Sequence, residues 1–271
     1  MLTPPTLNSN LISLQPTEGV AIMLGNILRT LKSGTEHLNY GRDIIAAMAQ
    51  KHLKHGQDTA RVLDIGFGSG ADLLNIRQSI KGREVILYGV DGYEPHVQQG
   101  ASKKINASLL DIESERLPFE DQFFDIVVAN QVIEHTKDIF WIFSEISRVV
   151  KPGGCVIIGV PNLASLHCRV QLLIGKQPSC IEVLGPHVRG VTKESFERFV
   201  TADGYYRVIE QKGSNFYPFP PAIAKILSRL LPGFAVSLII HIQRTEKSGK
   251  FIDILKTRFF ETNFRTAEKT S

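Results

Sequence analysis

The stretch VLDIGFGSG, residues 62–70, decides the fold that this chain adopts. It has the pattern of an apolar strand that runs into three glycines, Gly66, Gly68 and Gly70, and then into a helix. Glycine lets the backbone approach a ligand closely, and the first turn of a helix offers backbone amides without partners inside the helix. The stretch therefore predicts a ligand-binding turn between a strand and a helix.

Strands and helices alternate along the chain on either side of this turn. Short apolar runs of strand length are separated by stretches in which apolar residues recur at helical spacing. Such alternation predicts a mainly parallel sheet with helices on both faces. Strands are expected at 61–65, 84–90, 124–129, 155–160, 205–211 and 234–243, and helices at 22–31, 42–53, 71–80, 93–104, 138–150, 193–201 and 223–231.

The composition bounds the partners and the compartment. Because 43% of the 271 residues are apolar, the chain can bury a large core without a metal or a disulfide. The net charge of +4 comes without a long basic run, so no nucleic-acid partner is expected. Three cysteines without a CxxC pair predict neither a zinc site nor a disulfide framework. With no signal-peptide pattern at the N-terminus, a cytoplasmic location is expected.

Two cofactor classes compete for the glycine turn. Gly66, Gly68 and Ala71 also fit the GxGxxA form of the dinucleotide fingerprint, and Asp91 ends the second strand, where an acid would bind a ribose in either case. Asp64 distinguishes the two, because a carboxylate two residues before Gly66 would repel a pyrophosphate. The same carboxylate favours a ligand with an ammonium group and no phosphate, which is a description of S-adenosylmethionine.

Four motifs in order carry a resemblance to the class I S-adenosylmethionine-dependent methyltransferases. VLDIGFGSG is the first, and the others are YGVDGYE (88–94), LLDIESERLPF (109–119) with FFDIVVANQVIEH (123–135), and VVKPGGCVIIGVPN (149–162). The resemblance covers roughly residues 58–212. It implies a Rossmann-like, doubly wound α/β fold with a mainly parallel seven-stranded sheet, an antiparallel last strand and a cap on the acceptor side.

The resemblance also implies which residues hold the cofactor. Asp91 matches the acid that binds the ribose, and Asp111 with Ile112 matches the pair that holds the adenine. The spacing from Asp111 to LPF is two residues longer than the common form, so the adenine contact could shift to Glu113. The full set of expected cofactor contacts is Tyr40, Arg42, Asp64, Gly66, Phe67, Gly68, Gly70, Asp91, Gly92, Asp111, Ile112, Asn130, Gln131 and Glu134.

The domain layout follows from the same resemblance. We expect residues 1–57 to form an N-terminal arm and helices, 58–244 the methyltransferase domain, and 245–271 a C-terminal tail with a surface helix. Within the domain, 161–192 and 213–233 exceed the length of ordinary connections and are expected to be cap-like insertions. The linking strings resemble the ubiquinone- and menaquinone-biosynthesis type and uncharacterised bacterial members, which implies a small, partly apolar acceptor related to quinones, lipids or glycans.

His135 and His187 are the candidate general bases. Methyl transfer is an in-line displacement that needs a base only when the acceptor must lose a proton. The competing interpretation of His135 is a helix-start residue bonded to backbone. Arg189 could bind an acidic acceptor or pair with a surface carboxylate.

The apolar, proline-rich segment 218–231 has three interpretations. It could be a lid for a lipid-like acceptor, a contact with a membrane surface, or a helix that covers the core. The sequence also leaves two other functions open, a non-catalytic S-adenosylmethionine-binding protein and a nicotinamide-dependent oxidoreductase. It does not determine the oligomeric state.

Overall fold

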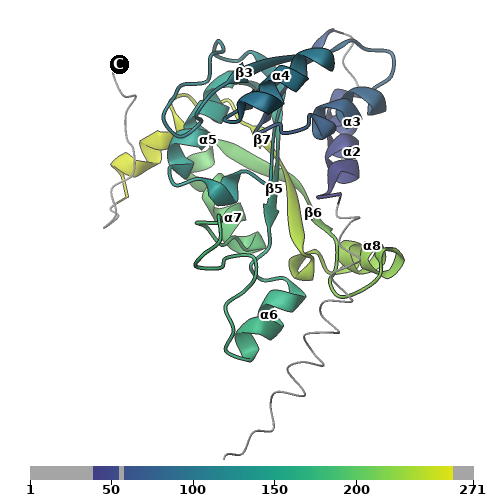
Figure 1. Ribbon diagram of the computed structural model, residues 1–271. Helices are drawn as coiled ribbons and strands as arrows, with labels where there is room; N and C mark the ends of the chain where they lie inside the picture. Colours follow the sequence, from purple (N-terminus) through teal and green to yellow (C-terminus); the bar gives the residue numbers. More distant parts are fainter. Residues whose placement is uncertain (1–38, 55–57, 259–271) are drawn as a thin grey trace, which may run out of the picture. The chain divides into compact units, whose positions relative to one another are not determined.

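A seven-stranded sheet in the order β3-β2-β1-β4-β5-β7-β6 runs through the computed structural model (Figure 1). The structure describes residues 39–54 and 58–258, so the expected arm and helix within residues 1–38 lie outside the described residues. β7 is antiparallel to both β5 and β6, and the other pairings are parallel. The strands are β1 (Ala60–Ile65), β2 (Val85–Asp91), β3 (Ile105–Leu109), β4 (Phe124–Asn130), β5 (Val150–Pro161), β6 (Tyr206–Ser214) and β7 (Ser237–Arg244).

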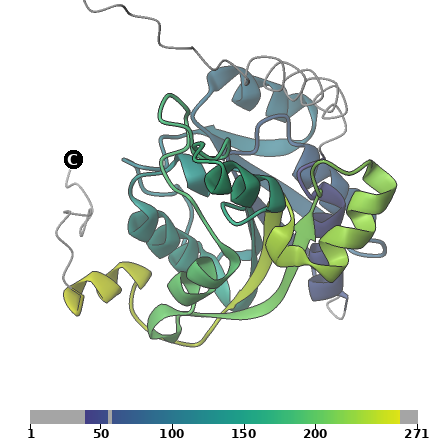
Figure 2. The same ribbon diagram turned by 90° about the horizontal axis from the view of Figure 1, so that it is seen from below.

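Helices cover both faces of the sheet, which confirms the doubly wound fold (Figures 1 and 2). One face packs against α2 and α3 through residues such as Ile45 and Leu73, and the other packs against α5 and α7 through Phe143 and Phe196. The helices are α2 (Arg42–Leu53), α3 (Ala71–Ser79), α4 (Glu94–Ser102), α5 (Ile139–Val149), α6 (Leu166–Leu173), α7 (Lys193–Val200) and α8 (Pro221–Leu230), with 3-10 turns η2 (Ile133–His135), η3 (Ala202–Gly204), η4 (Pro232–Phe234) and η5 (Phe251–Lys256).

Three elements differ from the sequence-based expectation, and the first is α6, a helix within a segment where none was expected. The edge strand β3 has the sequence INASL, in which Ile105 is the only residue that is fully buried, so no apolar run marked it. The segment after Thr245 was expected to carry a surface helix, but Phe251 and Ile254 of η5 are buried against α5 in the main core. The Phe251 ring packs against the rings of Phe143 and Phe199, and burial of a large aromatic side chain is strongly favourable.

The amphipathic helix α8 presents its small residues to the protein. Ala224 and Ser228 are buried, whereas Ile223, Ile226 and Leu230 are exposed, the last by 72%. The helix covers a small apolar cluster of Phe216, Ala224 and Ala235, against which Leu227 packs, and leaves the other large apolar side chains to the solvent. Within the described residues, none of the helices combines the length and the apolar character needed to cross a membrane.

Candidate active site

The glycine turn leaves the carboxyl end of β1 with three residues in left-handed conformations. The φ angles of Gly66, Gly68 and Gly70 are 67°, 52° and 75°, which residues with a side chain rarely adopt. The Gly66 amide donates to the carbonyl oxygen of Val90 on β2 at 2.8 Å. The side chain of Phe67 is buried below the turn, so close to Gly89 that a Cβ there would lie 2.6 Å from the ring. Phe67 therefore offers a ligand its backbone and not its ring.

Asp91 ties the end of β2 to this turn. Its carboxylate accepts hydrogen bonds from the backbone amides of Gly68 and Tyr93, both at 2.9 Å. Nδ1 of His96, on α4, lies 3.1 Å from the same carboxylate. The position of Asp91 beside the turn is the one expected of a ribose-binding acid. The sequence did not predict His96, because no motif links a histidine in the first turn of this helix to the acid that ends the strand before it.

Three buried acids converge behind the turn. Asp64 is 2% exposed, and burial together with the nearby carboxylates of Asp72 and Asp91 raises the pKa of Asp64 well above its usual range. Arg42 opposes that shift, and its Nε lies 3.7 Å from Asp72 Oδ1. Burial and mutual repulsion disfavour the charged forms of these acids, so a cationic ligand would stabilise their carboxylates, whereas a pyrophosphate would add to the repulsion. Asp72 is a member that sequence reasoning missed.

Tyr40 and Arg42 lie together where α2 begins. The Arg42 guanidinium carbon is 5.6 Å from the centre of the Tyr40 ring, and Tyr40 is largely exposed. Gly41 between them has a φ of 77°, and a Cβ there would lie 2.6 Å from Ile239 on β7. The close approach of Gly41 to the sheet thus sets both side chains at the carboxyl edge.

Polar atoms without hydrogen-bond partners gather at the ends of β4 and η2. Asn130 donates from Nδ2 to Asp72 at 3.0 Å, but its Oδ1 has no partner among the described residues. The same holds in that part of the chain for Gln131 Nε2 and both carboxylate oxygens of Glu134. Burial raises the pKa of Glu134 to about 7. Buried polar atoms of this kind normally have partners, so the edge has the donors and acceptors that a polar cofactor requires.

The chain beyond β3 forms a turn held by its own acids. Asp111 accepts from the Ser114 hydroxyl at 2.5 Å and from the Glu113 amide at 3.0 Å. The Glu113 carboxylate accepts from the backbone amides of Lys137 and Asp138, just before α5. Ile112 is half-buried beside the main core. Both carboxylates thus accept hydrogen bonds within the protein, and the adenine contact stays a prediction for Asp111 with Ile112 or for Glu113.

The structure brings His135 and His187 together, although 51 residues separate them. Their ring centres are 4.7 Å apart. His187 Nδ1 lies 2.7 Å from the Cys180 carbonyl oxygen, and His135 Nδ1 lies 3.3 Å from that of Pro186. Since a carbonyl oxygen only accepts, each Nδ1 carries the hydrogen, and Nε2 of each neutral ring can take up a proton. Burial, helped by His187, lowers the pKa of His135.

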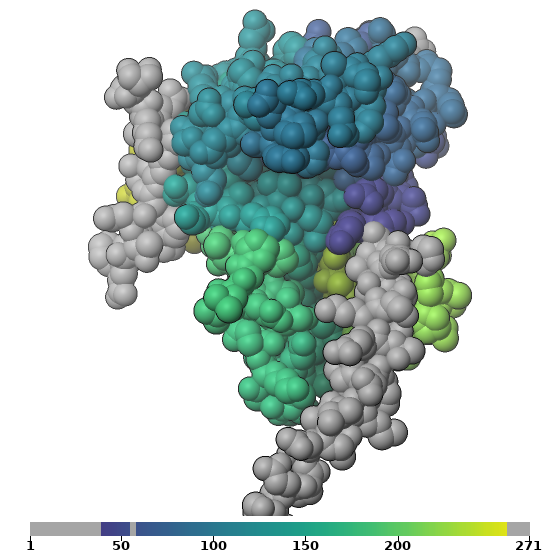
Figure 3. Space-filling model, viewed as in Figure 1, coloured from purple at the N-terminus to yellow at the C-terminus, as the bar shows by residue number. Residues whose placement is uncertain are grey.

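The segment 161–192 leaves β5 and projects past the carboxyl edge, where its green atoms form the lower part of the described surface (Figure 3). Its link to the site is a hydrogen bond from the Val188 amide to the Glu134 carbonyl oxygen at 2.9 Å. Arg189 donates to the backbone carbonyl of Lys137 at 3.1 Å, and the nearby carboxylate of Asp138 also acts on its guanidinium. Large apolar side chains are exposed along the segment, namely Val170, Leu172, Leu173, Ile174, Val183, Leu184 and Val188.

Comparison with known proteins identifies the family. Residues 63–158 match a family described as a methyltransferase domain. A demethylmenaquinone methyltransferase of Chlorobaculum tepidum is 34% identical over 46% of this chain and 50% of its own length, so the match spans half of that relative. The corresponding protein of Chlorobaculum parvum is 27% identical over 66% of this chain and 77% of its own length.

The fold has solved counterparts. A 1,6-didemethyltoxoflavin-N1-methyltransferase of Burkholderia thailandensis, with bound S-adenosylhomocysteine, has a TM-score of 0.51 at 14% identity and covers 89% of this chain and 94% of its own. At that identity the likeness concerns the fold alone. The sheet order, the glycine turn with its acids, and the sequence match agree. Residues 63–158 of this chain therefore form a methyltransferase domain of the S-adenosylmethionine-dependent type.

Proposed function

We propose that the chain binds S-adenosylmethionine along the carboxyl ends of β1, β2 and β4 and transfers its methyl group to a small, partly apolar acceptor. The observation that carries this proposal is the buried acidic group Asp64, Asp72 and Asp91, opposed by Arg42 alone among the cations that shift the pKa of Asp64. A ligand with an ammonium and a sulfonium relieves the repulsion between these carboxylates. A dinucleotide would add two negative charges to it.

Different residues bind different parts of the cofactor. The left-handed glycine turn lets the backbone approach the ligand, and Asp91 offers its carboxylate to the ribose. Asp111 and Ile112 contact the adenine end, and Tyr40 with Arg42 closes over the methionine end. Unpartnered atoms of Asn130, Gln131 and Glu134 supply further hydrogen bonds. The bound cofactor supplies an electrophilic methyl group, and the chain aligns the acceptor with it.

A proton-accepting group lies beside this path. When the acceptor loses a proton on methylation, Nε2 of His187 or His135 takes it up, because both rings hold their hydrogen on Nδ1. The carboxyl of Glu134 lies beside the two rings, and because its pKa is about 7 it gains or loses a proton near neutral pH. The ligand atoms of these three residues lie within 4.8 Å of one another.

The acceptor side is apolar with few polar groups. The exposed aliphatic side chains of 161–192 lie beyond the strand ends where ligands of open α/β sheets bind. Relatives named for demethylmenaquinone support an acceptor related to quinones, and lipid- or glycan-related acceptors fit the same surface. The outward face of α8, with Ile223, Ile226 and Leu230, would rest on a membrane that supplies such an acceptor.

The experiment is a transfer assay with labelled S-adenosylmethionine and a lipid extract as the source of acceptor. Labelled product that forms with the parent chain and not with Asp91→Ala supports the proposal. A chain that binds the cofactor but labels nothing in aqueous or lipid extracts would be a non-catalytic S-adenosylmethionine-binding protein.

A further inference from the structure

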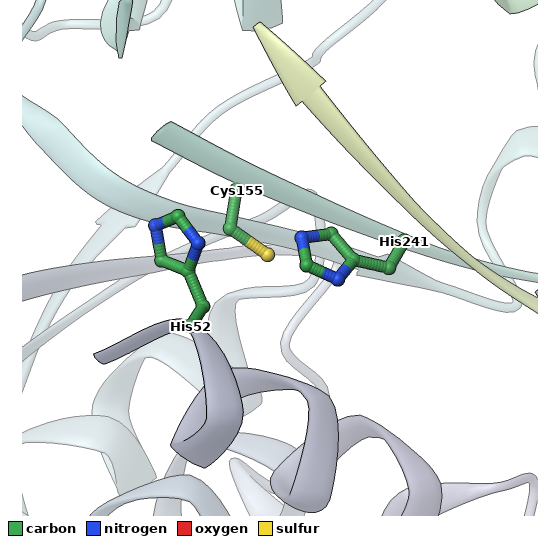
Figure 4. Close-up of side chains that lie close together, drawn as sticks. All are labelled: His52, Cys155 and His241. Carbon is green, nitrogen blue, oxygen red and sulfur yellow. The ribbon is translucent and has the colours of Figure 1, made fainter. Parts of the chain in front are cut away.

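Three residues that can bind a metal meet on the α2 face of the sheet. His52 comes from the last turn of α2, Cys155 from β5 and His241 from β7, and their ligand atoms all lie within 4.8 Å of one another. Figure 4 shows the sulfur of Cys155 between the two imidazole rings. The ring centres are 5.8 Å apart and nearly perpendicular. No spacing motif joins the three residues, so the sequence did not predict this group.

His241 carries the second, independent observation. Its side chain is only 4% exposed, yet neither Nδ1 nor Nε2 has a hydrogen-bond partner among the described residues. A neutral imidazole has one donor and one acceptor, and burying both without partners is unfavourable. Buried polar atoms normally have partners, so an unpartnered imidazole that faces a thiol and a second imidazole calls for an explanation.

We propose that His52, Cys155 and His241 bind a divalent transition-metal ion, with zinc as the expected occupant. Two imidazoles and one thiolate suit zinc, and water on the half-exposed side of His52 would complete a tetrahedron. Tetrahedral zinc separates its ligand atoms by about 3.3–3.6 Å, so the His52 side chain would move by about 1 Å. Binding releases the thiol proton of Cys155 to solvent, and the sulfur then bonds to the metal as a thiolate.

The surrounding charges are compatible with a cation. Glu210 on β6 stands opposite His241 in the β6–β7 pairing and can accept the remaining ring hydrogen, as carboxylates beside metal-bound histidines do. Lys51 Nζ lies 3.6 Å from Glu210 Oε2. Asp125 and Arg83 act on the His52 ring with opposite signs. Glu210 also pairs with Lys212 at 3.0 Å, and Asp125 pairs with Lys151 at 2.6 Å, so the Cys155 thiolate is the main negative charge that a bound cation would meet.

The site is separate from the proposed cofactor site. Cys155 precedes Gly159 by four residues on β5, a distance of about 13 Å along an extended strand, and Gly159 pairs with Asn130 at the cofactor edge. The two sites share α2, which carries Arg42 at its start and His52 in its last turn. A bound ion would therefore hold α2 against the sheet, and α2 is the helix that presents Arg42 to the cofactor.

The test uses Co²⁺, because a cobalt–thiolate bond gives a charge-transfer absorption band in the near ultraviolet that imidazole and carboxylate ligands do not. The full-length chain, freed of metal with a chelator, is titrated with Co²⁺ and then with Zn²⁺. We expect one equivalent of Co²⁺ to produce the band and Zn²⁺ to displace it. Because methyl transfer is not measured, the outcome does not depend on the proposed function.

Substitutions show which residues give rise to the absorption band. Cys155→Ser is expected to abolish it, and His52→Gln and His241→Gln to weaken Co²⁺ binding by more than the 10–100-fold typical of lost outer partners. His52→Gln changes a half-exposed residue, so it keeps the test valid if His241→Gln does not fold. Cys180→Ser, which alters the thiol pair Cys168–Cys180 in the cap, is the matched control and should retain the band. No band in the parent chain, or a band that survives Cys155→Ser, would overturn the proposal.

Discussion

Replacing Asp91 by alanine tests how the cofactor is held. The carboxylate accepts the Gly68 and Tyr93 amides at 2.9 Å and lies 3.1 Å from His96 Nδ1, and we expect it also to accept the ribose hydroxyls. A hydrogen bond to a charged group contributes about 1.5–3 kcal/mol. Loss of the ribose contact alone should therefore weaken S-adenosylmethionine binding by about ten- to a hundredfold. Release of the Gly68 amide also loosens the glycine turn, so the upper end of that range is expected.

Isothermal titration calorimetry with S-adenosylmethionine and S-adenosylhomocysteine measures the effect. Both ligands should lose affinity equally, because they share the ribose. Asp58→Ala is the matched control, since Asp58 is exposed just before β1, at the opposite edge of the sheet. Circular dichroism should show that both variants keep the fold. Unchanged affinity in folded Asp91→Ala would refute the assignment of Asp91 to the ribose.

Three further predictions concern the acceptor side, the buried acid and the packing of the edge. His187→Ala should lower turnover far more than cofactor affinity. If the variant instead loses cofactor binding, the assignment of His187 to the acceptor side is wrong. Because burial raises the pKa of Glu134 from 4.5 to about 7, its protonation stabilises the fold fully below about pH 4.5, and this contribution of about 3 kcal/mol is lost as the pH rises to about 7. Glu134→Gln should accordingly flatten the dependence of urea-unfolding free energy on pH in that window, and parallel curves would refute it. Gly159→Ala should lower stability by about 1–3 kcal/mol, because its Cβ would lie 2.0 Å from Asn130 Oδ1, whereas Gly233→Ala, with no atom within 4 Å, should be nearly neutral in the same thermal melts.

Local sequence signals predicted the parts of the fold that depend on local physics. The glycine turn could be recognised because three left-handed residues in five positions require glycine. The strands β1, β4 and β5 could be recognised because they are mostly apolar and buried on both faces. The edge strand β3 lacked that signal. The sequence also did not predict that the apolar face of α8 is exposed, because hydrophobic periodicity identifies a helix but not the face that packs.

Contacts between distant segments account for what the sequence did not reveal at the site. Asp72 follows the glycine turn and resembles any acid in the first turn of a helix, until the fold sets it beside Arg42 and Asn130. The adjacency of His135 and His187 depends on how the long segment after β5 returns to η2. Neither the contacts of Asp72 nor the pairing of the two histidines follows from a fixed spacing in the sequence.

A competitive comparison of two cofactors tests the central claim most directly. The buried acids Asp64 and Asp72 beside the glycine turn should admit a cationic ligand and repel a pyrophosphate. Calorimetric titration of the purified full-length chain with S-adenosylmethionine, S-adenosylhomocysteine and NAD is predicted to show saturable binding of the first two and none of the third. Binding of NAD without binding of S-adenosylmethionine would contradict the account.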